Sequence, residues 1–250
     1  MARLTNTLDG LLDAALALVY PQACAACGVR GVERRADWPA CAACWGATRL
    51  FEGGETLCWK CGRPAGGEVP EEVRPSVRCR RCESEEFDAA RACGLYEGAL
   101  RAAVLGLKRD PFVPPRLARM LREAARRKPL DTATLVVPVP LHPARERERG
   151  FNQATLLASA VAEGTGLPLD TWSLARLAHS ERHRAGLDAR ARRESVAGAF
   201  AVARPRLVRG ESVLLVDDVF TTGATASACA RPLLDAGARA VFVLTAARAA

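Results

Sequence analysis

The 250-residue sequence lacks a long uninterrupted hydrophobic run. Its longest apolar stretch, residues 4–19, is interrupted by Asp9 and Asp13, and Arg3 is the only basic residue ahead of it. A membrane-spanning helix needs roughly 20 consecutive apolar residues, and a secretory signal peptide carries a basic region before its apolar core. The sequence therefore predicts neither, and it favours a cytoplasmic protein.

Aromatic residues are also scarce, at 5% of the chain. The net charge of +8 lies in the C-terminal part, because residues 1–92 are nearly neutral. Proteins that bind single-stranded DNA stack its bases on aromatic side chains, and the basic part has few of them, so binding of single-stranded DNA is only weakly indicated. A basic surface attracts phosphates of any kind, and solvated arginines explain the same charge. The tryptophans are interpreted as packing residues: Trp38, Trp45, Trp59 and Trp172.

Cysteine, in contrast, is abundant, with ten residues. Eight of them form four Cys-x-x-Cys pairs, the spacing of metal ligands. Disulfides are the alternative, but nothing in the sequence directs export to an oxidising compartment. Residues 24–82 show no sustained apolar periodicity, so this stretch has little core without a metal ion.

The cysteine pairs predict two structural zinc sites. Four thiolates in a tetrahedron leave no open position on the ion, as is typical of structural zinc. Redox dithiols or an iron–sulfur cluster are the alternatives for this spacing. Sequential pairing is favoured over a cross-braced one, because each set then closes a short local loop. The two sets are Cys24, Cys27, Cys41 and Cys44, and Cys58, Cys61, Cys79 and Cys82.

Single residues around these sets support the prediction. Gly28 and Gly62 each follow the second cysteine of a pair, where the backbone is expected to take a positive φ. Cys93 and Cys229 have no partner at ligand spacing and are predicted to be buried apolar residues.

The pattern of apolar residues changes after residue 86, where short apolar runs alternate with stretches of helical periodicity. Strands are predicted at residues 90–96, 134–139, 212–216 and 240–244, and helices at residues 100–108, 116–127, 152–163 and 225–236, with a loop up to residue 150. The alternation indicates an α/β domain with a mostly parallel sheet and helices on both faces. We therefore predict an N-terminal helix in residues 1–22, a double zinc-binding module in residues 23–86 and the α/β domain in residues 87–250.

Residues 213–225 carry the most informative motif, Val-Leu-Leu-Val-Asp-Asp-Val-Phe-Thr-Thr-Gly-Ala-Thr. A buried strand is followed by two acids and a loop of small residues that opens a helix. In open parallel sheets, ligands bind at the carboxyl ends of strands, and the N–H groups of such a loop point at a phosphate. The hydroxyls of Thr221, Thr222 and Thr225 add donors.

Asp217 and Asp218 would repel a phosphate if they faced it. Ribose hydroxyls or a Mg²⁺ ion would give the two carboxylates a role. The alternative is that they merely cap the following helix, but this does not explain the Thr-Thr-Gly-Ala-Thr run.

A second candidate contact is the basic segment that follows the strand at residues 134–139. Pro140 and Pro143 suggest a stiff loop that presents arginines before the next helix. Arg149 and Gly150 are the preferred contacts to a pyrophosphate. His142 and Arg145 come second, and Lys108 with Arg109 is a weaker candidate. Alternatively, Glu146 and Glu148 pair with the arginines on a solvated surface.

Residues 216–225 resemble the phosphoribosyl-pyrophosphate signature of type I phosphoribosyltransferases. The whole chain resembles the ComF family of competence-associated proteins, which join a cysteine-rich zinc ribbon to such a domain. Residues 137–145 (Val-Pro-Val-Pro-Leu-His-Pro-Ala-Arg), 149–153 (Arg-Gly-Phe-Asn-Gln) and 196–200 (Val-Ala-Gly-Ala-Phe) carry this second resemblance.

The resemblance implies roles for single residues. Asp217 and Asp218 hold the ribose 2′- and 3′-hydroxyls, and the residues that surround the 5′-phosphate are Val219, Thr221, Thr222, Gly223, Ala224 and Thr225. The sequence departs from the family at Arg184 and Ser195, where ComF proteins usually show Gln and Asn. His183, in the basic stretch of residues 174–195 that corresponds to a loop closing over the substrate, is interpreted as an exposed residue.

Two functions follow from the resemblance. The first is a protein of DNA uptake in natural transformation whose pocket binds phosphoribosyl pyrophosphate with Mg²⁺ and whose zinc ribbon docks a competence helicase or another uptake protein. The second is an active phosphoribosyltransferase that acts on a nucleobase or amine. Whether the chain is an enzyme stays open, because Thr221 replaces the catalytic Asp of several purine phosphoribosyltransferases and no segment resembles a hood for a base.

Overall fold

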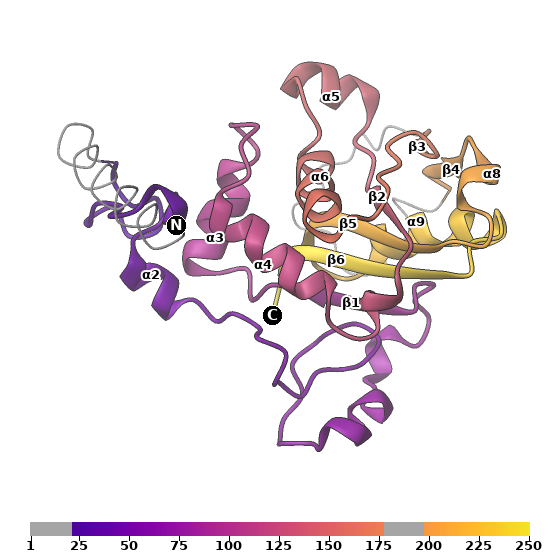
Figure 1. Cartoon of the computed structure of the whole chain (residues 1–250), viewed down its shortest axis with the longest axis horizontal. Coiled ribbons are helices and arrows are strands. Elements are labelled where there is room, and N and C mark those ends of the chain that lie inside the picture. Colours follow the sequence, from indigo (N-terminus) through magenta and orange to yellow (C-terminus); the bar gives the residue numbers. More distant parts are fainter. Residues whose placement is uncertain (1–21, 178–197) are drawn as a thin grey trace, which may run out of the picture.

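The computed structural model describes residues 22–177 and 198–250, and its centre is a four-stranded parallel sheet (Figure 1). The strand order is β1-β6-β5-β2. In chain order the strands are β1 (Ala89–Ala92), β2 (Leu135–Pro138), β5 (Ser212–Phe220) and β6 (Ala240–Arg248). Because all four run in parallel, their carboxyl ends meet at one edge of the sheet.

Helices cover both faces of this sheet. Alternate residues of β5 separate the two cores: Leu214 and Val216 belong to one apolar cluster, and Val213 and Leu215 to the other. The first cluster includes α3 (Gly98–Gly106), α4 (Pro115–Ala125) and α6 (Gln153–Thr165), and the second includes α9 (Ala224–Asp235). This confirms the predicted α/β class with a parallel sheet covered on both faces.

A small second sheet lies beside α9 and was not expected from the sequence. Strands β3 (Leu174–Arg176) and β4 (Phe200–Val202) pair antiparallel, and the short helix α8 (Pro205–Val208) follows. Each strand has only three residues, which is too few to show the alternation of apolar and polar residues by which a strand is predicted. Trp172, just before β3, was predicted to pack but is 68% exposed, with the Arg204 guanidinium over its ring, so that prediction was wrong.

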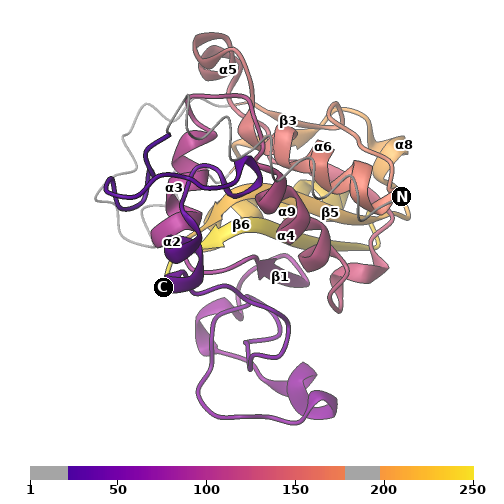
Figure 2. The same ribbon diagram turned by 60° about the vertical axis from the view of Figure 1, so that its left-hand side comes forward.

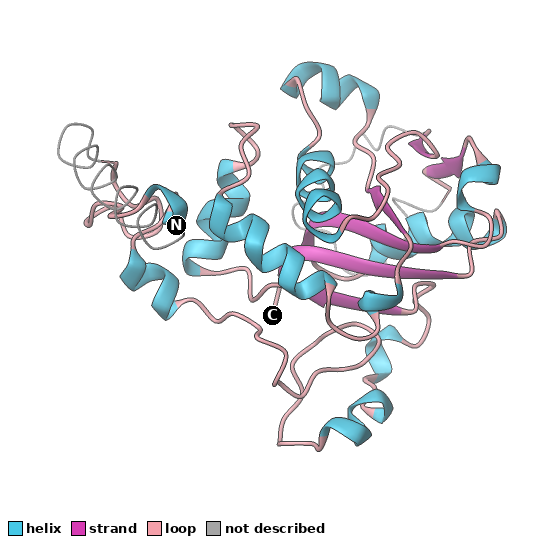
Figure 3. Ribbon diagram, in the orientation of Figure 1, coloured by secondary structure: helices cyan, strands magenta, loops and turns pink. Residues whose placement is uncertain are grey.

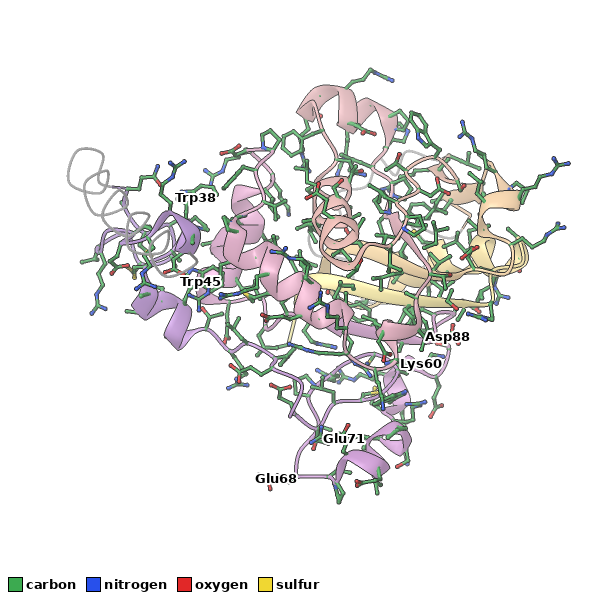
Figure 4. The ribbon with its side chains drawn as sticks, in the orientation of Figure 1. Trp38, Trp45, Lys60, Glu68, Glu71 and Asp88 are labelled. Carbon is green, nitrogen blue, oxygen red and sulfur yellow. The ribbon has the colours of Figure 1, made fainter. Side chains whose placement is uncertain are left out.

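The cysteine-rich segment consists of two similar halves, mostly loop with short helices (Figure 3). The first zinc half, residues 22–48, contains η1 (Arg35–Asp37) and α2 (Ala42–Ala47) and lies against α3 (Figure 1). The second zinc half, residues 56–86, contains η2 (Glu71–Ser76) and η3 (Arg80–Cys82) and lies below β1 (Figure 2). Figure 4 shows Trp38 and Trp45 in the first half and Lys60 and Glu71 in the second.

Several element bounds differ from the predicted ones. β1 ends at Ala92 instead of residue 96, β5 continues to Phe220 and β6 to Arg248. The two long strands support each other, since Asp217 pairs with Thr245 and Val219 with Ala247. The acids therefore lie within β5, not beyond its end. A further 3₁₀ turn, η4 (Leu130–Thr132), precedes β2.

The predicted loop before residue 150 is in fact a short helix, α5 (Pro143–Arg149). His142 caps it by accepting a hydrogen bond from Ala144 N–H at Nδ1 (3.1 Å), and Pro143 occupies the first turn. Gly150 ends the helix with a φ of 84°. Proline at the start and glycine after the end are helix signals, but they were interpreted as loop signals.

Residues 1–21 of the predicted N-terminal helix lie outside the described residues, and the division at residues 22 and 86 stays a prediction. No helix in residues 22–177 or 198–250 is both long enough and apolar enough to cross a membrane.

Candidate functional site

The eight paired cysteines form two separate four-sulfur clusters. The ligand atoms of Cys24, Cys27, Cys41 and Cys44 lie within 4.8 Å of one another, as do those of Cys58, Cys61, Cys79 and Cys82. The sequential pairing is therefore confirmed. Each half repeats the same turn: Gly28 N–H donates to Cys24 O, and Gly62 N–H donates to Cys58 O, both at 2.8 Å. The predicted positive φ is also confirmed, at 70° for Gly28 and 68° for Gly62.

The geometry of the clusters fits zinc. A tetrahedral ion with Zn–S bonds of about 2.3 Å places its sulfurs roughly 3.8 Å apart. The Cys58 and Cys82 sulfurs are 3.6 Å apart, and those of Cys61 and Cys79 are 3.5 Å apart. Backbone N–H groups support the sulfurs, because Cys79 N–H donates to Cys58 Sγ at 3.2 Å. Burial acts to raise the pKa of Cys58, but such N–H donors bring it down to about 7, which favours the thiolate.

Two buried arginines attach the second zinc half to the sheet. Arg91 in β1 donates from Nη1 to Trp59 O (2.8 Å) and lies over the Trp59 ring. Arg248 in β6 donates from Nη1 to Cys61 O (2.6 Å). Burial lowers the pKa of Arg91 to about 10, and the charge of Cys58 acts in the opposite direction. The packing role predicted for Trp59 is confirmed by its contact with Arg91, and that predicted for Trp45 by its burial, since Trp45 is 1% exposed.

Residues 221–225, which we call the 221–225 loop, connect β5 to the first residues of α9 and are closely packed against the end of β5. Gly223 starts α9 with a φ of 87°, and a side chain there would lie 3.1 Å from the Phe220 ring. Thr222 Oγ1 accepts a hydrogen bond from Ala224 N–H (3.4 Å). The first N–H groups of a helix have no intrahelical partner, so α9 presents donors and a partial positive charge at this loop.

Asp218 is held by side chains from two neighbouring helical segments. Its Oδ2 lies 3.9 Å from Lys108 Nζ, which follows α3, and accepts a hydrogen bond from Gln153 Nε2 (3.4 Å) at the start of α6. Arg149 Nη1 in turn donates to Gln153 Oε1 (2.5 Å). The four side chains form a polar chain of alternating donors and acceptors. Asp217 Oδ1 accepts a hydrogen bond from the backbone N–H of Asp218 (2.8 Å).

Helix α5 presents two of its arginines on one side. Arg145 and Arg149 are one turn apart and line the same pocket, whereas Arg147 does not. Among the described residues, neither Glu146 nor Glu148 forms an ion pair with them, so the alternative of a self-paired basic surface is not what the structure shows. His142 is engaged in capping α5, and Arg109 does not line the pocket.

These elements enclose an open pocket of about 450 Å³ at the carboxyl edge of the sheet. Ten of the predicted site residues line it: Lys108, Arg145, Arg149, Asp217, Asp218, Val219, Thr221, Thr222, Ala224 and Thr225. Gly223 lines a small adjoining cavity together with Asp217 and Thr225. The structure therefore brings the predicted residues together from three separate segments of the chain: residue 108, residues 145–149 and residues 217–225.

Three polar lining residues were not predicted: Asn152, Gln153 and Arg176. Asn152 caps α6 and donates from Nδ2 to Val139 O (3.0 Å), which joins the end of β2 to the helix. The Arg-Gly-Phe-Asn-Gln motif contained this signal, but only its arginine and glycine were assigned a role. Arg176 lies over the Phe200 ring in the small sheet. His179, His183, Arg184 and Ser195 fall outside the described residues.

Comparison with known proteins identifies the family. A model of the double zinc ribbon domain matches residues 15–83. DNA utilization protein YhgH of Salmonella typhi is 34% identical over 215 residues, which cover 82% of this chain and 88% of that protein. Competence protein F of Haemophilus influenzae is 30% identical over 227 residues, which cover 84% of this chain and 96% of that protein. The chain belongs to the ComF family.

A further relative in the ComF family, competence protein ComFC of Bacillus subtilis, is 35% identical over 107 residues, or 43% of this chain and 41% of that protein. The zinc ribbon match and the sulfur geometry agree, so the two clusters are structural zinc sites. Among solved structures, the glutamine phosphoribosylpyrophosphate amidotransferase from B. subtilis aligns with 54% of this chain and 28% of that chain, at 22% identity and a TM-score of 0.36. A TM-score this low does not bear on the function.

Proposed function

We propose that the pocket binds 5-phosphoribosyl-1-pyrophosphate, or a related phosphorylated ribose, together with Mg²⁺. The observation that carries this proposal is the position of two carboxylates directly before the 221–225 loop in one pocket. The loop's N–H groups, its threonine hydroxyls and the N-terminus of α9 suit a terminal phosphate. The carboxylates suit a diol or a cation.

The cationic side chains account for the remaining charge of such a ligand. Lys108, Arg145 and Arg149 line the same pocket as the 221–225 loop, and a pyrophosphate carries several negative charges. Guanidinium groups bind phosphate oxygens with two parallel hydrogen bonds. In this arrangement Gln153 positions both Arg149 and Asp218, because it hydrogen-bonds to each of them. A bound Mg²⁺ would supply charge neutralisation beside these carboxylates.

The direct test is the binding of phosphoribosyl pyrophosphate to the zinc-loaded full chain, measured by calorimetry with and without Mg²⁺. We expect magnesium-dependent binding in the wild type and a loss of at least about 100-fold in affinity in Asp217→Ala/Asp218→Ala, since two charge-assisted contacts are removed. Glu71→Ala/Glu72→Ala removes a similar adjacent acidic pair outside the pocket and should bind normally. Equal affinity in both double variants would refute the assignment.

A second candidate function is pentosyl transfer by an active phosphoribosyltransferase. The cluster of Lys108, Arg145 and Arg149 beside Asp218 favours it, because cations there would stabilise a leaving pyrophosphate. A screen of nucleobases and amines for pyrophosphate release tests this function. Release with any one acceptor would establish an enzyme, and no release with any of them would leave a binding protein.

The names of the relatives, competence proteins and DNA utilization proteins, suggest the setting. We propose that the chain acts in the cytoplasm in DNA uptake, with the zinc-binding module docking a competence helicase or another uptake protein. Few aromatic side chains accompany the basic residues, which argues against direct recognition of single-stranded DNA as the main interaction.

A further inference from the structure

The second zinc half reaches the base of the 221–225 loop through one buried glutamate. Glu85 follows the zinc ligand Cys82, to whose carbonyl its N–H donates (3.2 Å), and the residue is only 5% exposed. Its Oε2 accepts a hydrogen bond from the hydroxyl of Ser227 in the first turns of α9 (2.5 Å). The same hydroxyl accepts from Glu86 N–H (2.8 Å). The end of the second zinc half is thus bonded to the start of α9.

The Glu85 carboxyl group also touches the loop itself. A side-chain carbon added at Gly223 would lie 3.2 Å from Glu85 Oε2 and 3.3 Å from Glu85 Cδ. The Ser227 N–H donates to Gly223 O (2.8 Å), so the serine bonded to Glu85 is also bonded to the loop glycine. The position of the glutamate therefore limits where the backbone at Gly223 can lie, and this is where α9 presents its free N–H groups.

Phe220, the last residue of β5, also contacts residues that follow the second zinc half or are hydrogen-bonded to it. The ring of Phe87 packs edge-on against the Phe220 ring, with centroids 5.8 Å apart. The Arg248 guanidinium lies over the Phe220 ring, 5.4 Å from its centroid, and donates to Cys61 O in the second zinc half. Phe220 and Ser227, which flank the 221–225 loop, therefore both contact residues that belong to the second zinc half, follow it directly in sequence or are hydrogen-bonded to it.

The first zinc half has no such connection. Its corresponding attachment is Arg116 of α4, which pairs with Asp37 (2.7 Å) and lies over the Trp45 ring at 4.7 Å. Within the described parts of the chain, no hydrogen bond or ion pair joins residues 22–48 to residues 219–227. The two zinc sites are similar in chemistry but differ in what they support.

We propose that the second zinc site positions the 221–225 loop through Glu85, with Phe87 and Arg248 holding Phe220, whereas the first zinc site does not. Glu85 is a positioning residue in this arrangement, because it contacts the loop and not the pocket. The consequence for ligand binding rests on the function proposed above. The coupling itself is a property of the protein alone and can be measured without any ligand.

The test compares Glu85→Ala, Glu85→Gln and Arg116→Ala in the full chain, after each has been shown to retain two zinc ions. Amide hydrogen exchange of residues 221–227 is measured without ligand. In Glu85→Ala we expect exchange about tenfold faster or more, because a buried charge-assisted hydrogen bond is lost. Glu85→Gln keeps an acceptor for Ser227 and should restore most of the protection. Arg116→Ala should leave residues 221–227 unchanged.

Ser227→Ala serves as a second variant outside the zinc-binding module, should Glu85→Ala fail to fold, and it should show the same faster exchange. Binding of phosphoribosyl pyrophosphate is then measured on the same samples, with about tenfold weaker affinity expected for Glu85→Ala. If wild type does not bind, the proposed ligand is wrong while the exchange data still decide the coupling. Unchanged exchange in both Glu85→Ala and Ser227→Ala, or equal loosening in Arg116→Ala, would overturn the inference.

Discussion

Cys93 illustrates how burial decides the chemistry of a single residue. It follows β1, is 1% exposed and lies in the same apolar cluster as α3 and α4. Burial raises the pKa of its thiol to about 12. The sequence predicted a buried apolar residue because no second cysteine stood at ligand spacing, and the structure confirms this prediction. The Cys93 thiol therefore stays protonated well above neutral pH.

This burial predicts a specific loss of stability at alkaline pH. A thiol whose pKa is raised in the folded state stabilises the protein fully below its unfolded value of 9.0, and this contribution is lost as pH rises toward about 12. Within that window the wild type should lose up to about 1.4 kcal/mol of unfolding free energy per pH unit relative to Cys93→Ala. Urea unfolding of both proteins between pH 8 and pH 11, at constant zinc concentration, measures the difference. Parallel pH profiles would contradict the assignment.

Helix α5 lines the pocket with two arginines, although the sequence had predicted a loop at its position. Its capping by His142, its proline in the first turn and its end at Gly150 fix the direction in which Arg145 and Arg149 point. In a loop, the two arginine side chains would not need to point in the same direction. In a helix, residues four apart lie on the same face, so both point into the pocket. The residue types were enough to predict that Arg145 and Arg149 contact the ligand. Their alignment on one side depends on the helical backbone, which the sequence analysis did not predict.

The left-handed conformation at Gly150 should make this helix end sensitive to a methyl group. Nothing lies within 4 Å of a side-chain carbon built there, so Gly150→Ala adds backbone strain and no steric contact. We expect a loss of about 1–2 kcal/mol. Gly46→Ala is the matched control, because Gly46 also has open space but lies within α2, where alanine should stabilise by roughly 0.5–1 kcal/mol. Urea midpoints of the two variants should move in opposite directions, and equal shifts would argue against the assigned helix end.

At the scale of the whole molecule, the zinc-binding module and the sheet share their cores. Cys24, Cys41 and Trp45 belong to the apolar cluster on one face of the sheet, and Cys58, Cys61 and Cys82 belong to the cluster on the other. Each zinc half therefore depends on the ion for its own shape and on the sheet for burial of its apolar side. Between the two halves the chain runs from beside α3 to below β1 (Figure 2).

Removal of zinc should consequently unfold the module before the sheet. Elemental analysis should find about two zinc ions per chain, and a chelator should make residues 22–86 sensitive to limited proteolysis while the parallel sheet still resists. Identification of the first cleavage sites by mass spectrometry measures the order. Readdition of zinc before the protease should restore resistance. A chain that contains no zinc, or that is cleaved first within the sheet, would contradict this prediction.

Residues close together in the chain were enough to predict both zinc-ligand sets and most of the residues that line the pocket. Ligand spacing identified both zinc sites, and the acids with the small-residue loop identified the pocket, because these signals depend on neighbours in the chain. The packed structure was needed to show that Gln153 links Arg149 to Asp218, that the acids lie within β5, and that the Glu85 carboxyl group lies next to Gly223. These contacts join residues far apart in sequence, and their geometry depends on how the packed helices and the extended strands fit together.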